Sequence, residues 1–340
     1  MAKSLEIVAA ALGAPGGGIL AADESTGTIK KRFDSVHAKS TEETRRNYRE
    51  MLFQTEVAMR ENISGVILYD ETIRQKAKDG TPLVELIKAA GTIPGIKVDQ
   101  GAKPMAGHPG ELVTEGLTGL RDRLADYYEL GARFAKWRAV INIASHIPTP
   151  ACIRANMHAL ARYAALCQEA NIVPIVEPEV LMDGDHDIER CYEVTEATLR
   201  SLFAELYEQR VNLEGTVLKP SMVISGSKCT NRAGVEEVAE KTVHCFRRAV
   251  PAAIPSIVFL SGGQSDLDAT AHLNAINSLG NLPWQMSFSY GRALQAAPLK
   301  AWSGKTENEP KAQAALAHRA AMNGLATQGA WKPELEKATP

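Results

Sequence analysis

The stretch "GTVLKPSM", residues 215–222, is an apolar run that ends in Lys219 and is stopped at once by Pro220. A run this short, with glycine before it and proline after it, is typical of a buried strand. Burying a lysine is costly unless its charge is paired. A lysine at the end of a buried strand therefore indicates either an ion pair or a chemical use, and the fold decides which groups surround it.

Apolar runs of similar length recur along the 340 residues, and we predict that each is a strand. The other seven are "GGILAADES" (17–25), "GVILYDE" (65–71), "GIKVDQG" (95–101), "RFAKWRAVI" (133–141), "IVPIVEPEV" (172–180), "SIVFLSGG" (256–263) and "QMSFSYG" (285–291). Each is flanked by Gly, Pro or polar turns and is too short for a typical helix.

The segments between these runs have a helical hydrophobic period. Ser40 and Glu43 match the capping box that begins a helix. The predicted helices include 41–60, 151–169, 188–210, 234–249 and 266–279. Eight strands that alternate with helices predict an α/β fold, a single (β/α)8 TIM barrel. An open doubly wound sheet has the same alternation, but "GAPGGG" (13–18) precedes its strand and so is no dinucleotide fingerprint.

The chain divides by composition near residue 303. We expect residues 1–303 to form the barrel and residues 304–340 to form an Ala-rich C-terminal helix followed by a flexible tail, packed on or near the barrel. Residues 1–17 loosely resemble a signal peptide, but Glu6 interrupts the apolar part. We expect a helix there that docks on the barrel.

Composition excludes several classes of partner. The net charge of −2 lacks the basic excess that nucleic-acid binding requires. No apolar run approaches the length needed to span a membrane. Five scattered cysteines with no C-x-x-C pair predict reduced thiols in a cytoplasmic protein.

Charged residues gather at the predicted carboxyl ends of the strands, where barrel enzymes have their active sites. Residues two apart on a strand point to the same side. The set that should converge is Asp23, Lys97 with Asp99, Lys136 with Arg138, Glu177 with Glu179, and Lys219. A structural lattice of salt bridges is the alternative to an active site, since such lattices also bury paired charges.

Lysines flanked by carboxylates, without a metal or cofactor motif, indicate imine chemistry. A lysine amine is nucleophilic only when deprotonated, and desolvation or a neighbouring cation favours that form. It would attack a carbonyl, and the resulting iminium would accept electrons as a neighbouring C–C bond is broken or formed. Glu177 and Glu179 would transfer protons. Residue types alone leave Lys136 and Lys219 as alternative nucleophiles.

The last two predicted strands are followed by glycine-containing turns that lead into helices. These are "LSGGQSDLDATAHL" (260–273) and "FSYGRALQAA" (288–297), with Arg292 at the second helix start. Backbone N–H groups at such turns bind phosphate, and the loops after strands seven and eight are the usual phosphate site of this fold. The sequence therefore predicts a phosphorylated substrate.

These motifs resemble a known family. The segments "LAADESTGTIKKR", "GIKVDQG", "AKWRAV", "PIVEPEVL", "GTVLKPSMV", "FLSGGQS" and "FSYGRALQ" are similar to class I fructose-1,6-bisphosphate aldolase, and the resemblance runs in unbroken order from about residue 5 to 303. It implies a metal-independent lyase that cleaves fructose 1,6-bisphosphate reversibly into dihydroxyacetone phosphate and glyceraldehyde 3-phosphate. It also implies glycolytic and gluconeogenic use, no cofactor, and a cytoplasmic homotetramer.

The resemblance implies roles for five residues. Lys219 is similar to the Schiff-base lysine, Glu177 to the general acid/base with Glu179 as its partner, and Asp23 to the residue that handles the proton of the C4 hydroxyl. Lys136 is similar to the second lysine beside the nucleophile. The resemblance assigns the C1 phosphate to Ser261, Gly262, Gly291 and Arg292, and the C6 phosphate and sugar hydroxyls to Ser25, Thr28, Lys97, Arg138 and Arg32.

Three features depart from the family pattern. Gln100 stands where a lysine is expected and Ser221 where an asparagine is expected. Animal members end in a tyrosine that assists proton exchange, whereas this chain ends in "EKATP" with no tyrosine after Tyr290. That role is not carried over to this chain.

Three other functions compete with this one. A Schiff-base aldolase of the same fold could act on a related sugar monophosphate. A zinc aldolase is disfavoured, because the eight histidines lack ligand spacing and "DGDHDIER" (183–190) is better explained as a helix start. A non-catalytic barrel could use its charged mouth only to bind anions.

Overall fold

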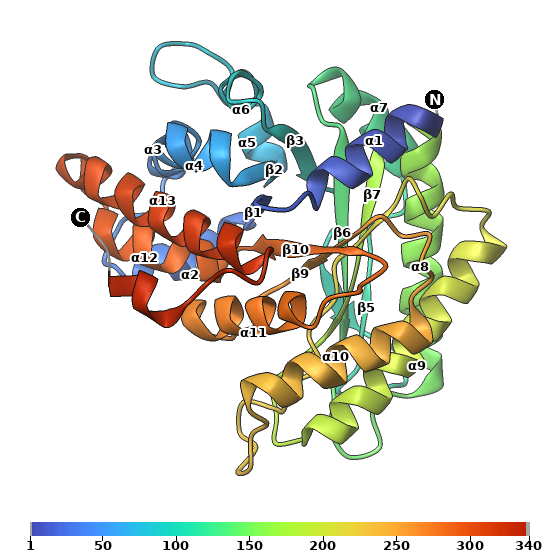
Figure 1. The fold of residues 1–340 in the computed structure, drawn as a ribbon. Coiled ribbons are helices and arrows are strands. Elements are labelled where there is room, and N and C mark those ends of the chain that lie inside the picture. Colours follow the sequence, from blue (N-terminus) through green and yellow to red (C-terminus); the bar gives the residue numbers. More distant parts are fainter. Residues whose placement is uncertain (1, 338–340) are drawn as a thin grey trace.

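The computed structural model describes residues 2–337 as a closed barrel of eight parallel strands surrounded by helices (Figure 1). The barrel strands are β1 (Gly18–Ala22), β2 (Ile63–Leu68), β3 (Ile93–Lys97), β6 (Phe134–Ile141), β7 (Val173–Val180), β8 (Val217–Leu218), β9 (Ser256–Phe259) and β10 (Gln285–Tyr290). They pair in the order β1-β10-β9-β8-β7-β6-β3-β2, which closes on itself. All eight predicted strands are present, and the predicted (β/α)8 barrel is confirmed. The strand that precedes Lys219, β8, is only two residues long.

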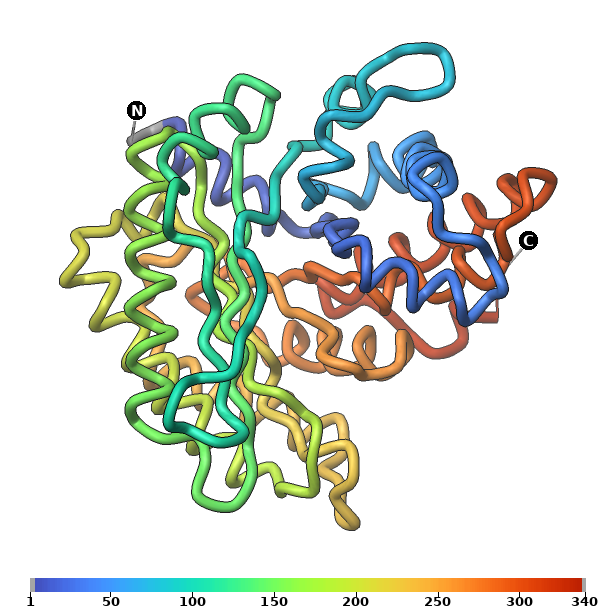
Figure 2. The backbone as a smooth tube through the Cα atoms, turned by 180° about the vertical axis from the view of Figure 1, so that it is seen from behind, coloured from blue at the N-terminus to red at the C-terminus, as the bar shows by residue number. Residues whose placement is uncertain are grey.

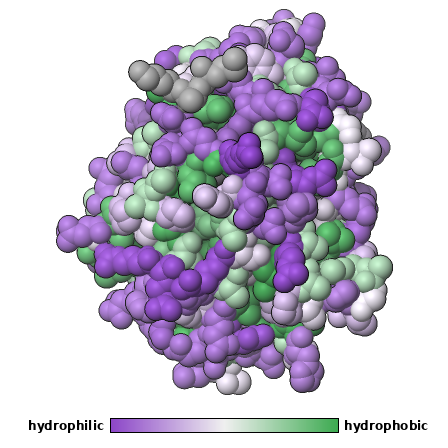
Figure 3. All heavy atoms as spheres, turned by 90° about the vertical axis from the view of Figure 1, so that its right-hand side faces the viewer, coloured by the Kyte–Doolittle hydropathy of each residue, from purple (hydrophilic) through white to green (hydrophobic). Residues whose placement is uncertain are grey.

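Helices follow the strands and pack around them. They are α1 (Ala2–Leu12), α2 (Thr26–Asp34), α3 (Glu42–Phe53), α4 (Glu56–Glu61), α5 (Asp70–Ile73), α6 (Leu83–Ala89), α7 (Leu120–Glu129), α8 (Pro150–Glu169), α9 (Ile188–Glu208), α10 (Val235–Ala249), α11 (Asp266–Ser278), α12 (Arg292–Trp302) and α13 (Glu309–Ala326). A small hairpin, β4 (Ala102–Pro104) and β5 (Leu112–Thr114), follows β3. On the side that carries α8 and α9, the surface is largely hydrophilic with small hydrophobic patches (Figure 3).

The predicted helix 41–60 is wrong in two details. The chain forms α3 and α4 instead of one helix, and the hydroxyl of Thr55 donates to the carbonyl of Met51 at 3.1 Å where the first helix ends. Such a local side-chain bond competes with the helical ladder. The cap is also one residue later than expected: Thr41 and Thr44 each accept from the other's backbone N–H, at 3.1 and 2.8 Å.

Helix α1 closes the amino-terminal end of the barrel. Its Leu5, Ala9 and Leu12 are buried against inward-facing strand residues, and together they form one apolar cluster. The ring of Phe134 fills the space beside Gly95, where an added Cβ would lie 2.3 Å from the ring. The expected docking of an N-terminal helix is therefore observed, and it makes this end of the barrel a packed core.

The C-terminal helix α13 packs against α11, α12 and α4. Figure 2 shows this last part of the chain, in red, beside the blue helices of the first quarter. The tail that was expected to be flexible contacts this layer: Trp331 and Arg319 both donate to the carboxylate of Glu336, at 2.9 and 2.5 Å. Residues 338–340 lie outside the described residues. None of the described helices is long and apolar enough to cross a bilayer.

Candidate active site

A cavity of about 1170 Å³ opens at the carboxyl-terminal end of the barrel. Alternation along the strands places charged side chains there: two residues beyond Phe134, Ile175 and Val217 come Lys136, Glu177 and Lys219. All fifteen residues predicted for the site line this cavity: Asp23, Ser25, Thr28, Arg32, Lys97, Asp99, Lys136, Arg138, Glu177, Glu179, Lys219, Ser261, Gly262, Gly291 and Arg292.

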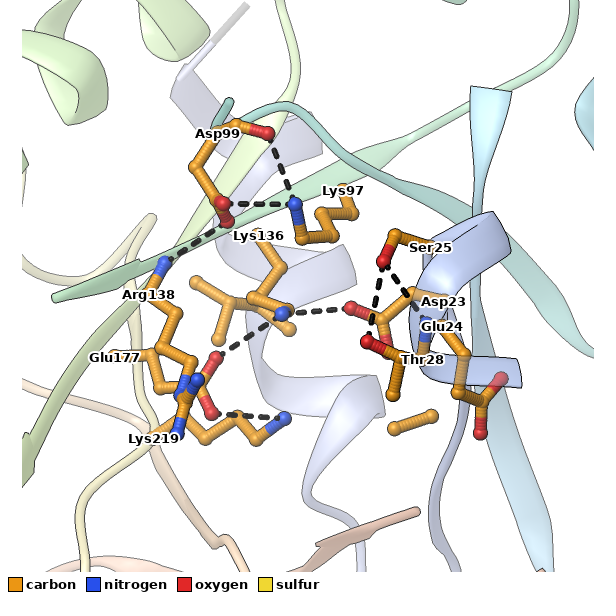
Figure 4. Close-up of polar contacts among 12 residues, drawn as sticks. Asp23, Glu24, Ser25, Thr28, Lys97, Asp99, Lys136, Arg138, Glu177 and Lys219 are labelled. Carbon is orange, nitrogen blue, oxygen red and sulfur yellow. Dashed lines mark hydrogen bonds and ion pairs between the residues drawn. The ribbon is translucent and has the colours of Figure 1, made fainter. Parts of the chain in front are cut away.

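Four charged side chains form a row across the cavity floor (Figure 4). The ammonium group of Lys136 lies 2.6 Å from Asp23 Oδ2 and 3.3 Å from Glu177 Oε2. The other carboxylate oxygen of Glu177 lies 3.3 Å from the Nζ atom of Lys219. Lys136, Glu177 and Lys219 are buried, with 3–4 % of their surface exposed. Glu177 is thus the one carboxylate in the row that contacts both lysines.

The two groups at one end of the row are held in their charged forms. Burial alone would raise the pKa of Asp23, but the charges of Lys136 and Lys219 outweigh it and lower that pKa well below its ordinary value. Burial alone would lower the pKa of Lys136, yet the carboxylates of Asp23, Glu177 and Asp99 raise it far above the ordinary lysine value. Lys136 therefore remains an ammonium ion at neutral pH.

A second group of charges lies above the floor. Asp99 follows the end of β3 and accepts from Lys97 Nζ at 2.7 Å and from the backbone N–H of Arg138 at 3.2 Å. The Arg138 guanidinium is paired with Glu179, and although burial opposes its charge, this carboxylate raises the Arg138 pKa. Glu179 therefore lies beside Arg138, whereas Glu177 lies beside Lys219.

The glycine-containing turns after β9 and β10 meet at the opposite wall. Gly262 and Gly263 have φ values of +57° and +99°, which side chains rarely adopt, so the turn after Ser261 depends on glycine. A Cβ on Gly263 would lie 3.4 Å from the Arg292 guanidinium, and one on Gly291 would lie 3.5 Å from that of Arg32. Both arginines therefore lie against these turns. Among residues 2–337, Arg292 has no acidic side chain within ion-pair distance.

The hydroxyl groups predicted for substrate binding lie at the start of α2. Ser25 caps this helix, and its Oγ accepts from the N–H of Thr28 at 3.4 Å and lies 3.1 Å from the Thr28 hydroxyl. The side chain of Arg32, one turn further along the same helix, contacts the carboxylate of Glu24. The same guanidinium lies against the Gly291 turn.

Two residues that line the cavity, Glu24 and Ser289, are not predicted from the sequence. Glu24 is adjacent to Asp23, and neighbouring residues on a strand point to opposite sides, so the pattern that predicts Asp23 in the cavity does not predict Glu24 there. Ser289 lines the cavity with a buried hydroxyl that has no hydrogen-bond partner in the described chain. Its place on β10, two residues after Ser287, is a signal that alternation could have supplied. Of the two departures, Gln100 lines the cavity, and Ser221 is buried, donating to the carbonyl of Val180 at 2.8 Å.

The fold is a (β/α)8 barrel with a cavity lined by charged side chains at the carboxyl-terminal ends of its strands. Comparison with known proteins defines it further. The family model of glycolytic class-I fructose-bisphosphate aldolase matches residues 4–339. A probable class 1 fructose-bisphosphate aldolase of Xanthomonas campestris pv. campestris is 64 % identical over 331 residues, covering 97 % of this chain and 99 % of the relative.

More distant relatives agree. A cytosolic fructose-bisphosphate aldolase of Arabidopsis thaliana is 53 % identical, covering 98 % of this chain and 86 % of its own. The solved structure of the Plasmodium falciparum aldolase, in complex with TRAP and an inhibitor, has a TM-score of 0.95 at 49 % identity and covers 97 % of this chain and 96 % of its own. The chain belongs to the class-I fructose-bisphosphate aldolase family. It is an enzyme, a lyase of the aldolase type, and the predicted resemblance is confirmed.

Proposed function

We propose that Lys219 forms the imine through which this aldolase cleaves fructose 1,6-bisphosphate reversibly into dihydroxyacetone phosphate and glyceraldehyde 3-phosphate. The observation that carries the proposal is the row Asp23, Lys136, Glu177, Lys219 on the cavity floor. Lys136 contacts two carboxylates and is held as a cation, so it is a poor nucleophile. Lys219 contacts only one of them and lies beside that cation.

Glu177 serves imine formation. The amine of Lys219 attacks the ketone carbon of the substrate and forms a C–N bond, which gives a carbinolamine. Glu177, 3.3 Å from Lys219 Nζ, transfers a proton from nitrogen to oxygen as the carbinolamine forms. In its protonated form it then gives a second proton to the hydroxyl group, which leaves as water, so that the nitrogen keeps its remaining hydrogen and an iminium results. Lys136 keeps this carboxylate oriented from its other side. Glu179 forms an ion pair with Arg138 and so holds that guanidinium at the side of the cavity.

Asp23 serves cleavage of the C–C bond. As an ionised carboxylate it accepts the proton of the C4 hydroxyl. The electron pair of the C3–C4 bond moves to the iminium, the aldehyde product leaves, and an enamine remains on Lys219. Protonation of the enamine carbon followed by addition of water releases the ketone product and restores the amine. The electron pair that leaves the C3–C4 bond is returned to carbon in this last protonation, so the cycle involves no net oxidation or reduction.

The two phosphate groups occupy opposite walls. In the strand order, β9 and β10 lie across the ring from β3 and β6. The turns after β9 and β10 supply Ser261, Gly262, Gly291 and Arg292 for the C1 phosphate. Lys97 and Arg138, from β3 and β6, are assigned to the C6 phosphate on the facing wall. Ser25, Thr28 and Arg32, which follow β1 beside β10, are assigned to the sugar hydroxyls and the C6 phosphate from the adjacent side.

The remaining proposals concern cofactor use, cellular location, assembly and domain organisation. We propose that the reaction needs no metal or other cofactor, because the class-I family to which the chain belongs is metal-independent. We propose a cytoplasmic location, which is supported by a relative named as cytosolic. We also propose a role in glycolysis and gluconeogenesis. We also propose a homotetramer, with residues 1–303 as the catalytic barrel and residues 304–340 as an appended layer.

Comparison of substrates tests this function. After exhaustive chelation, we expect full activity and faster cleavage of fructose 1,6-bisphosphate than of fructose 1-phosphate, because only the bisphosphate has an anion for each wall. Both products are measured by coupled assays. Equal rates with the two substrates would favour a monophosphate aldolase, and loss of activity on chelation would favour a metal enzyme.

A further inference from the structure

The backbone on both sides of Asp23 is held from outside the barrel. Gln295 on α12 donates from Nε2 to the carbonyl of Ala21 at 2.7 Å. Arg49 on α3 donates from Nη2 to the carbonyl of Glu24 at 2.8 Å. Both side chains are buried, with 2 % and 1 % of their surface exposed. The short segment that presents Asp23 to the cavity is therefore fixed at each end.

The carboxylate of Glu24 joins these two contacts. It accepts from Gln295 Nε2 at 2.8 Å, pairs with Arg32, and lies 3.8 Å from the Arg49 guanidinium. The amide of Gln295 has two hydrogens, so it can donate to Ala21 and Glu24 together. The carboxylate of Asp23 contacts Lys136, whereas that of Glu24 contacts Gln295 and the two arginines.

Arg49 also ties the neighbouring loop to this segment. Its Nη1 donates to the hydroxyl of Thr72 at 2.6 Å, on the short helix α5 that follows β2. Burial lowers the pKa of Arg49, and the nearby carboxylates of Glu24 and Glu71 act against that shift. A buried charge of this kind is weak evidence for stability, and fixing one conformation is its better-attested use.

We propose that Arg49 and Gln295 are positioning residues that hold the Asp23 carboxylate against Lys136 and so serve cleavage of the C–C bond. The inference rests on the proposed roles of Asp23 and Lys219. Neither residue contacts Glu177 or Lys219, which lie on β7 and beyond β8. Formation of the imine should therefore be independent of both.

Substitutions that remove these donors separate the two steps. Gln295→Leu keeps the approximate volume and removes both hydrogen bonds. Arg49→Lys keeps the charge, but a single ammonium group cannot reach both Glu24 and Thr72 as the guanidinium fork does. For each variant we expect kcat for fructose bisphosphate cleavage to fall about 10- to 100-fold, the cost of a small misplacement. KM should change less than kcat, and borohydride trapping of dihydroxyacetone phosphate on the enzyme should remain at the wild-type level.

Matched control variants exist at positions remote from the cavity. Gln168 similarly donates to the carbonyls of Asn212 and Gly215, at 2.7 and 3.2 Å, before β8. Arg319, also buried, donates to the hydroxyl of Thr270 at 2.6 Å. We expect Gln168→Leu and Arg319→Lys to lower the melting temperature without changing kcat per folded enzyme. If they lowered kcat as much as the test variants, the effect would be structural and the inference wrong.

A double-mutant cycle makes the test decisive. Because Gln295 acts through Asp23, adding Gln295→Leu to Asp23→Asn should cause no further loss of kcat. Additive losses would overturn the inference, as would trapping that falls in parallel with kcat. If Gln295→Leu did not fold, the same cycle with Arg49→Lys would decide. Failure of the wild-type enzyme to be trapped at Lys219 would instead refute the proposed function.

Discussion

The two ends of the barrel are built from the same strands, but one end is an apolar core and the other is a charged cavity. At the amino-terminal end, Phe134, Ile175 and Val217 pack with α1 into an apolar cluster. Two residues further on, roughly 7 Å along each strand, Lys136 and Lys219 stand with a carboxylate between them. The first end supplies stability through burial of apolar surface. The carboxyl-terminal end instead contains buried charges, which contribute little to stability on their own. The proposed catalytic reaction gives these charges a role.

The largest contrast is expected from Lys219→Ala. Removing the amine should lower kcat by about 10⁴-fold or more, because no other group forms the imine. The melting temperature should stay near the wild-type value or rise, since a buried lysine with one carboxylate contact is lost. Activity assays and thermal unfolding on the same preparation measure both. Residual turnover within about tenfold of wild type would show that another group is the nucleophile.

At the apolar end of the barrel, Leu12→Ala should lower stability without lowering activity. This side chain is fully buried between α1 and the strands. We expect a loss of about 2–5 kcal/mol in the free energy of unfolding, from lost burial and the cavity left behind. The kcat per folded enzyme should not change. Denaturant titration gives the first quantity, and a selective drop in kcat with no loss of stability would break the comparison between the two ends.

The smallest effect concerns pH. The neighbouring lysines make the pKa of Asp23 lower in the folded protein than in the unfolded chain. Ionised Asp23 therefore stabilises the fold at any pH above the pKa of the unfolded chain. This stabilisation is lost as the pH falls toward the pKa of the folded protein. The difference in melting temperature between the wild type and Asp23→Asn should therefore narrow as pH is lowered from about 6 to about 3. A difference that widened with acid would mean that Asp23 is not held ionised by Lys136.

Features that depend on local period were predictable from the sequence, and those that depend on distant partners were not. The strands and the inward charges follow from alternation, which is why residues such as Lys136 and Glu177 were placed correctly. Residue types alone left the choice between Lys136 and Lys219 open, and the resemblance to the aldolase family favoured Lys219; the distances to Asp23 and Glu177 add support for the same proposal. The contacts of Gln295 join positions more than 270 residues apart, and no pattern in "GRALQ" indicates them. The split between α3 and α4, where the Thr55 hydroxyl donates to the carbonyl of Met51, has no signal in the hydrophobic period of residues 41–60.

The most direct test of the central claim is to locate the covalent intermediate. The enzyme is incubated with dihydroxyacetone phosphate, reduced with sodium borohydride, digested and analysed by mass spectrometry. The account predicts that the substrate adduct is found on the peptide containing Lys219, and that Lys219→Ala carries none. An adduct on Lys136, or no adduct in an active enzyme, would contradict it.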